Sequence, residues 1–154
     1  MHVERREVPA ASLISPYVDG SNFVDAYFVA RPGVALPNYV DRFFTTPIFR
    51  LERSILRLTG GVPSEDQQVA ALASGTGEVM ASWRVEARSD DELLLVVPGT
   101  PIRTWLAVDD RGIWFGSVIV AGPDGNIPFM IRALIPFHAL YSRVLLWAAA
   151  RRMP

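Results

Sequence analysis

Apolar and polar residues alternate along several short segments of the chain, which is typical of β-strands. The first such segment is Phe23–Arg31, and Pro32-Gly33 follows directly after it. One of its faces is uniformly apolar, whereas the other carries Asp25 and Tyr27. We therefore predict a strand that presents a carboxylate and a phenol on its less apolar side.

Later segments also predict strands: Gln67–Ser74, where the pattern is weak, then Glu78–Arg88, Leu93–Val97, Ile102–Val108 and Ile113–Val120. Short turns rich in aspartate, glycine and proline separate the last four of them. Consecutive strands joined by short turns indicate an antiparallel meander.

Two short helices are predicted between the first strand and the meander. Asn38 is placed to cap a helix over Tyr39–Phe44, and Thr46-Pro47 has the signature of a second helix start. We expect the second helix to end near Thr59, where Gly60-Gly61 follows. Its apolar residues recur at helical spacing and are expected to face the core: Ile48, Leu51, Ile55 and Leu58.

The longest helical pattern covers Pro128–Arg152. One face of this helix combines apolar and polar side chains: Leu134, His138, Tyr141, Leu145 and Ala148. Arg132 and Arg143 share another face and are expected to contact water. Pro136 lies inside the pattern and should kink or divide the helix.

The order of elements is strand, helix pair, four or five antiparallel strands and a long terminal helix. This order predicts an α+β fold of the helix-grip type, in which a curved antiparallel sheet wraps around the C-terminal helix. We expect a single domain over residues 1–154, with an irregular segment at residues 1–20. A helix laid across a curved sheet encloses space, which aromatic side chains either fill or line as a ligand cavity.

Composition narrows the possible functions. The chain has 154 residues and no cysteine, which excludes disulfides, thiolate metal sites and cysteine nucleophiles. It has no lysine, which excludes a Schiff base or a P-loop. A formal net charge of −1 argues against nucleic-acid binding. We expect no signal peptide and no transmembrane segment, because arginines interrupt the apolar C-terminal run, and we expect a cytoplasmic protein.

Three stretches carry a resemblance to known proteins: Phe23–Tyr27, Gly77–Val85 and Ile135–Val144, the last of which contains Pro136-Phe137-His138. With the order of elements, they resemble the START-like (SRPBCC) superfamily of lipid-transfer domains, polyketide cyclases and pollen allergens. The likeness is closer to an uncharacterised bacterial family placed with that superfamily. The resemblance implies a helix-grip fold with a cavity, but it implies no particular reaction.

The chain departs from that family at three positions. Met80 and Ser82 stand where the family tends to have histidine and aspartate, and Ala139 stands where an arginine commonly follows the histidine. If the polar strand residues of the family perform chemistry, this chain has lost them.

The candidate catalytic residues are His138, Tyr141 and Asp25. His138 could act as a general acid or base or could donate to a bound polar group; alternatively it is a structural histidine bonded to a backbone carbonyl or to Tyr141. Asp25 could orient His138 or bind a ligand hydroxyl; alternatively it is a solvated carboxylate at a sheet edge.

The candidate ligand-contacting residues are Trp83, Arg103, Trp105, Phe115, Leu134 and Tyr27. The aromatic residues could stack against an apolar ligand or belong to the ordinary core. Trp114 and Phe115 cannot both face one cavity, because adjacent strand residues point to opposite sides. Arg103 could bind a carboxylate, or it could pack its stem against the sheet and point to solvent.

Other chemistries lack their motifs. The two histidines, His2 and His138, cannot supply a zinc site, and no G-x-S-x-G nucleophile elbow or dinucleotide-binding loop is present. We therefore expect no metal and no cofactor. The spacing of Arg50, Arg53 and Arg57 fits a solvated helix face, with an acidic partner as the alternative.

The leading hypothesis is a module that binds a small, mainly apolar molecule between the sheet and the terminal helix. A second hypothesis is an enzyme that uses the same cavity for cyclase- or dehydratase-like proton transfer by His138. A third is a structural or interaction protein with a filled core that forms a homodimer.

Overall fold

The computed structural model describes residues 1–58 and 66–154, except for the side chains of residues 52, 53 and 55–57. In chain order the elements are β1 (Glu4–Arg5), η1 (Ser15–Tyr17), β2 (Phe23–Ala30), α1 (Leu36–Phe44), α2 (Pro47–Leu58), α3 (Asp66–Ser74), β3 (Val79–Met80), β4 (Trp83–Arg88), β5 (Glu92–Val96), β6 (Ile102–Val108), β7 (Gly112–Ile119) and α4 (Phe129–Arg151).

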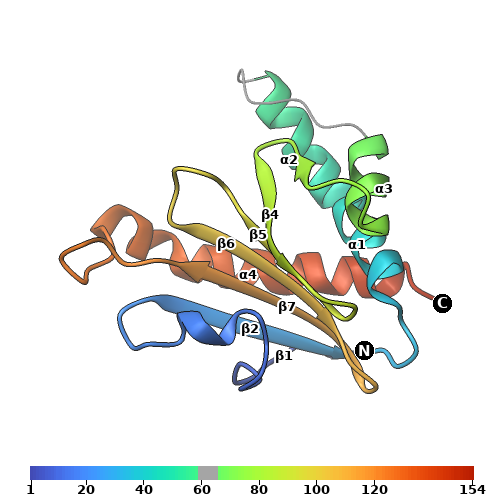
Figure 1. The fold of residues 1–154 in the computed structure, drawn as a ribbon, viewed down its shortest axis with the longest axis horizontal. Coiled ribbons are helices and arrows are strands. Elements are labelled where there is room, and N and C mark those ends of the chain that lie inside the picture. The colour runs from blue at the N-terminus through green and yellow to red at the C-terminus, as the bar shows by residue number, and fades with distance from the viewer. Residues whose placement is uncertain (59–65) are drawn as a thin grey trace.

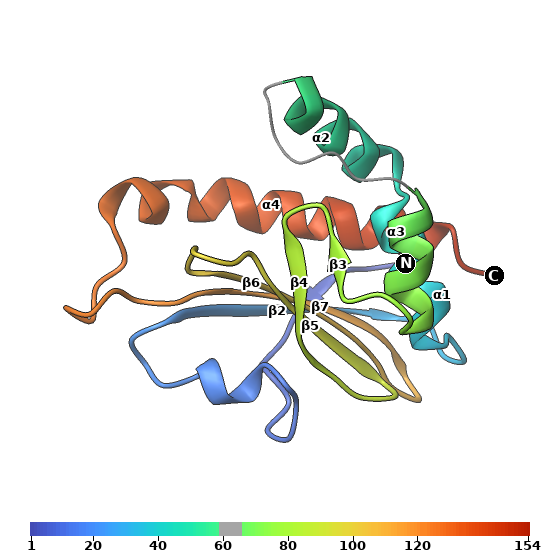
Figure 2. The same cartoon turned by 45° about the horizontal axis from the view of Figure 1, so that its top comes forward.

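The seven described strands form one antiparallel sheet in the order β1-β2-β7-β6-β5-β4-β3. Helix α4 runs along one face of the sheet, and α1, α2 and α3 gather near its C-terminal end (Figure 1). Turning the molecule shows the sheet curving beneath α4 (Figure 2). The predicted α+β helix-grip fold, with short helices after the first long strand, is confirmed.

Both faces of the sheet are covered. On the face toward α4, the core includes Tyr27, Leu106 and Phe115 together with Leu145 and Leu146 of the helix. On the opposite face, buried residues of β2, β5, β6 and β7 pack against Ile14 from the N-terminal segment. Within the predicted irregular residues 1–20, β1 adds an edge strand to the sheet, and the segment that includes Ile14 and η1 covers this face.

Two predicted strands were wrong. Residues 67–74 belong to α3, because Val69, Leu72 and Ala73 recur at helical spacing and are all buried. Residues 78–88 are not one strand, because the chain reverses at Ala81, whose φ is +52°, and Met80 pairs with Trp83. The result is the hairpin of β3 and β4.

The predicted helix pair needs two corrections. Helix α1 begins at Leu36 after Ala35, so Asn38 lies inside the helix and does not cap it. At the start of α2, the Phe49 N–H donates to the Thr46 hydroxyl at 3.2 Å, as the predicted cap requires. However, Leu51 and Leu58 are exposed, Leu58 to 86%, so they do not face the core.

Ile48 of α2 does pack against the core, as predicted. The side chains of Ile55, Arg53 and Arg57 lie outside the described residues, as do Thr59, Gly60 and Gly61. The predicted end of α2 and the predicted arginine stripe are therefore not placed.

Helix α4 is continuous through Pro136, so the proline does not divide it. Its 23 residues have the length and composition of a membrane-spanning helix, with a mean hydropathy of 1.3 over the most apolar window. Its C-terminal half packs into the domain through Ser142, Leu145, Leu146, Ala149 and Ala150.

Candidate functional site

A row of three polar side chains crosses the sheet on the face toward α4. Strand register pairs Ser117 of β7 with Asp25 of β2 on one side and with Thr104 of β6 on the other. All three residues are buried. Because the side chains of paired residues lie on the same face, the row places a carboxylate and two hydroxyls side by side beneath the helix.

Helix α4 places His138 over this row. Its Nε2 atom lies 2.9 Å from Oγ of Ser117 and 3.3 Å from Oγ of Ser142, one turn further along α4. The Ser142 hydroxyl already donates its proton to the His138 carbonyl oxygen at 2.8 Å. A Ser142 hydroxyl that donates to this carbonyl can accept from the ring, and with the ring proton on Nε2 the other nitrogen, Nδ1, is the one available to a ligand.

Asp25 is the unusual member of the row. Asp25 is only 2% exposed, and neither of its carboxylate oxygens accepts a well-aligned hydrogen bond. Burial raises the pKa of this carboxyl, while His138, the Tyr27 hydroxyl and Arg5 act in the opposite direction. A buried carboxyl with unused acceptor capacity is costly unless it is protonated or meets a partner.

Tyr27 extends the polar group along β2. Burial, followed by the charge of Asp25, raises the pKa of the Tyr27 phenol. The Arg143 guanidinium lies 5.6 Å from the centre of the Tyr27 ring, close enough for a cation–π contact. Arg143 therefore reaches back from α4 to the edge of the polar row.

A cavity of about 230 Å³ opens beside the row. Most of its wall is apolar or aromatic, and its polar side is formed by the hydroxyls and the histidine just described. The lining residues are Phe43, Phe44, Phe49, Trp83, Ile102, Arg103, Thr104, Phe115, Ser117, Val118, Ile119, His138, Tyr141 and Leu145.

The structure brings five of the predicted site residues to the wall of this cavity: His138, Tyr141, Trp83, Phe115 and Arg103. Asp25 and Tyr27 lie beside it, on the polar row and the neighbouring row of the same face, but they do not line it. Leu134 of α4 is exposed and lies away from the cavity wall.

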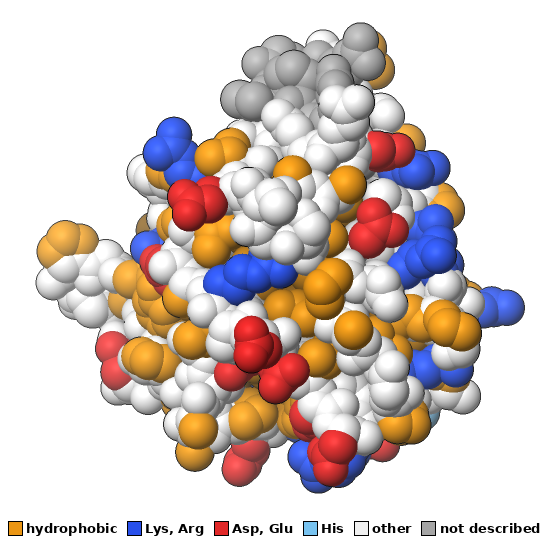
Figure 3. All heavy atoms as spheres, turned by 45° about the vertical axis from the view of Figure 1, so that its right-hand side comes forward, with side chains coloured by type: hydrophobic (Ala, Val, Ile, Leu, Met, Phe, Trp, Pro, Cys, Tyr) orange, Lys and Arg blue, Asp and Glu red, His pale blue; other side chains and the backbone are white. Residues whose placement is uncertain are grey.

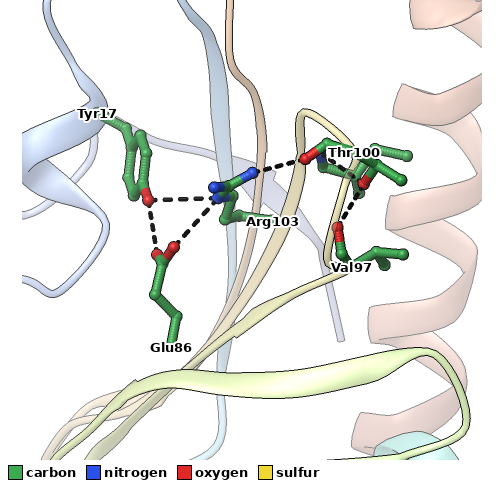
Figure 4. Close-up of polar contacts among 6 residues, drawn as sticks. Tyr17, Glu86, Val97, Thr100 and Arg103 are labelled. Atoms are coloured by element: carbon green, nitrogen blue, oxygen red, sulfur yellow. Dashed lines mark hydrogen bonds and ion pairs between the residues drawn. The ribbon is translucent and has the colours of Figure 1, made fainter.

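Arg103 borders the cavity, but its guanidinium is directed to the other face of the sheet (Figure 4). Its Nε atom lies 3.3 Å from both the Tyr17 hydroxyl and Oε1 of Glu86, and Nη1 donates to the Thr100 carbonyl at 2.9 Å. Arg103 thus links the N-terminal segment to the sheet, and its guanidinium does not offer a two-point contact to a ligand carboxylate.

Trp105 also lies on the face away from α4. It is buried in the second core, and its indole N–H donates to Glu92 at 2.7 Å. Arg103 and Trp105 share a face, as the alternation predicted, but the N-terminal segment covers that face.

Several residues of the site were not anticipated: Thr104, Ser117 and Ser142 in its polar part, and Phe43, Phe44 and Phe49 in its wall. The available signal was a polar residue at an inward position of an otherwise apolar strand, as at Thr104 and Ser117. Their adjacency depends on strand register, which the sequence does not reveal.

The arrangement can bind an apolar group against aromatic rings and can orient a polar end by hydrogen bonds, and His138 is placed to exchange a proton there. Among the described residues, no three histidine, aspartate or glutamate side chains gather as metal ligands. The comparisons with family models, curated proteins and solved structures found no match for this chain.

Proposed function

We propose that the protein binds a small, mainly apolar molecule in the cavity between the sheet and α4, in the manner of the START-like proteins that its sequence resembles. The observation that carries the proposal is the cavity itself, with aromatic walls and one polar side formed by Thr104, Ser117 and His138. The protein would act in the cytoplasm.

The size of the cavity limits the ligand. A buried apolar cavity of about 150 Å³ accepts benzene, whereas drug-sized ligands occupy about 300–1,000 Å³. A volume of about 230 Å³ fits a molecule a little larger than one aromatic ring. The polar side favours a ligand with one hydroxyl or carbonyl, which Thr104 and Nδ1 of His138 would orient.

The first experiment is native mass spectrometry of the purified protein beside a denatured sample. A reproducible excess mass that disappears on denaturation would identify a carried ligand. Thermal unfolding with 4-methylphenol and with toluene then tests the predicted chemistry, since the two probes differ by one hydroxyl. We expect both to raise the melting temperature, 4-methylphenol by more, because a ligand that binds the native state stabilises it.

A matched pair of variants locates the binding. Ile119 lines the cavity, whereas Val120, the next residue, packs against the core on the other face. Ile119→Trp should fill the cavity and abolish both shifts, and Val120→Trp should keep them. Absence of a carried mass together with no shift for either probe would refute the proposal. Shifts in Ile119→Trp as large as those of the wild type would also refute it.

One observation favours a second candidate, an enzyme that moves a proton on a bound ligand. Asp25 is buried without a well-aligned hydrogen bond, next to a histidine that reaches the cavity. Such a pair could share a proton during turnover. The ligand found by mass spectrometry, incubated with the protein in D₂O, would then gain deuterium at carbon with the wild type but not with His138→Gln. No uptake with the wild type would leave binding as the function.

A further inference from the structure

Helix α4 is apolar on two sides. Its sheet side carries the buried residues of the C-terminal half, whereas its outward side carries seven large apolar residues that are each 40–79% exposed: Phe129, Met130, Leu134, Phe137, Leu140, Val144 and Trp147. A helix that is apolar all round is normally buried on all sides. The outward side therefore has the composition of a contact surface.

These seven residues form one continuous stripe, because nearly all are separated by three or four positions, which places them on one side of the helix. At a rise of 1.5 Å per residue, the stripe is about 27 Å long. Single exposed apolar residues are ordinary, but a continuous stripe of this length marks a site of interaction. By contrast, acidic, basic and apolar side chains are interspersed on the side of the molecule shown in Figure 3.

The stripe is least covered over the N-terminal half of the helix. None of the residues 129–141 is buried, whereas five of the residues 142–150 are. Figure 2 shows α2 standing over the other half of α4, and no described element above the N-terminal half. A flat surface could reach this part of the helix without a rearrangement of the fold.

The charged residues of α4 itself all have one sign. The sequence from Gly125 to Pro154 contains no aspartate or glutamate, while Arg132, Arg143 and Arg151 are exposed on α4. Arg132 and Arg143 are eleven positions apart, which is close to three full turns, so they lie along one flank of the stripe. An apolar stripe bordered by arginine complements an apolar surface that carries negative charge.

We propose that the outward face of α4 docks on an anionic membrane surface, with the helix lying in the plane of the interface. Phenylalanine, leucine and tryptophan would enter the boundary of the acyl chains, and Arg132 and Arg151 would contact anionic headgroups. A second copy of the chain fits less well, since antiparallel α4 helices would bring arginine toward arginine with no acidic residue to pair with. Docking needs no ligand in the cavity, so it does not rest on the proposed function.

The test is flotation of the full chain with vesicles of phosphatidylcholine alone and of phosphatidylcholine mixed with phosphatidylglycerol. We expect binding to the mixed vesicles, weaker binding to the neutral ones, and a decrease as salt screens the headgroup charge. Phe137→Ser/Leu140→Ser removes two exposed apolar side chains and should weaken binding about tenfold. Arg132→Gln should weaken it about fivefold on the anionic vesicles only.

The matched control is Val18→Ser, which removes a side chain that is 58% exposed and lies outside α4. This variant should bind as the wild type does. Light scattering behind a sizing column reports the oligomeric state in parallel. A dimer that dissociates in Phe137→Ser/Leu140→Ser, without vesicle binding, would overturn the proposal in favour of a second copy. A monomer that floats with neither kind of vesicle would also overturn it.

Discussion

The two faces of the sheet differ in how the carboxylates that lie on them are hydrogen-bonded. On the face covered by the N-terminal segment, Glu92 accepts from the Trp105 indole at 2.7 Å and from the Leu13 N–H at 2.8 Å. Asp109 accepts from the Trp114 indole at 2.9 Å. On the face toward α4, the buried carboxyl of Asp25 has no well-aligned partner.

One face therefore stabilises the fold, whereas the other keeps polar atoms that could still form hydrogen bonds. Satisfied polar groups within an aromatic core hold the N-terminal segment against the sheet. The face toward α4 combines a cavity with a carboxyl that accepts no well-aligned hydrogen bond and a histidine held between two serines. Proteins retain such locally unfavourable groups mostly where they bind or react.

The largest expected effect is on the stabilising face. Trp105→Ala should lower the free energy of unfolding by about 3–5 kcal/mol, because a buried indole and its hydrogen bond are lost. Trp83→Ala, in the half-buried wall of the cavity, should cost about 1–2 kcal/mol. Urea unfolding of both variants measures the ranking, and a reversed order would break the comparison.

The next effect concerns the paired carboxylate. Glu92→Ala should cost about 2–3 kcal/mol, because it leaves the Trp105 and Leu13 N–H groups without their acceptor. Glu86 offers a control, since its partners Tyr17 and Arg103 are in a more exposed contact. Glu86→Ala should cost about 0.5–1 kcal/mol. Equal losses in urea unfolding would mean that the face covered by the N-terminal segment does not depend on the hydrogen bonds of Glu92.

For Asp25, whose carboxylate accepts no well-aligned hydrogen bond, the expected sign is opposite. Asp25→Asn should stabilise the protein at neutral pH by about 1 kcal/mol, because it removes the desolvation of a buried charge. The native pKa of Asp25 is raised above its ordinary value of 3.8. At pH values between the ordinary pKa and the raised native pKa, the native state binds more protons than the unfolded state. The stability of the wild type therefore falls as pH rises through this window.

The advantage of Asp25→Asn should therefore grow with pH across that window and then level off. Asp19 provides the control, because hydrogen bonds from Ser21 lower its pKa. The Asp19 carboxylate stabilises the wild type above its ordinary pKa, and this contribution disappears in acid. Asp19→Asn should lack the contribution at every pH. Denaturant unfolding over a pH series separates the two curves; an Asp25→Asn variant that is less stable at every pH would show that the carboxylate is satisfied.

The sequence predicted the fold well for a physical reason. Alternation over residues 102–108 and 113–120 and the long apolar terminal segment specify strands and a helix without reference to the rest of the chain. The prediction failed over residues 67–74, where a short apolar pattern fits either period, and at Ala81, where a left-handed residue starts a turn without glycine.

The site was predicted only in part. His138 and Asp25 stand out as polar residues in apolar patterns, so they could be found. Alternation also showed that Arg103 and Trp105 share a face, but it could not show which face meets α4, since both faces of the sheet are apolar. The row of Asp25, Ser117 and Thr104 was missed because register is set by pairing between strands distant in sequence.

The smallest expected change in stability sharpens the comparison most. Thr104 lies on the polar row and lines the cavity, and no hydrogen bond of its hydroxyl is found among the described residues. Thr104→Val keeps the branched shape that suits a strand and removes only the hydroxyl, so the free energy of unfolding should change by less than about 0.5 kcal/mol. The stabilisation by 4-methylphenol should then fall to that by toluene, which thermal unfolding measures. If Thr104→Val cost as much stability as Glu92→Ala, the Thr104 hydroxyl would be a structural group like those on the face covered by the N-terminal segment. The polar row would then have no free hydrogen-bonding group for a ligand.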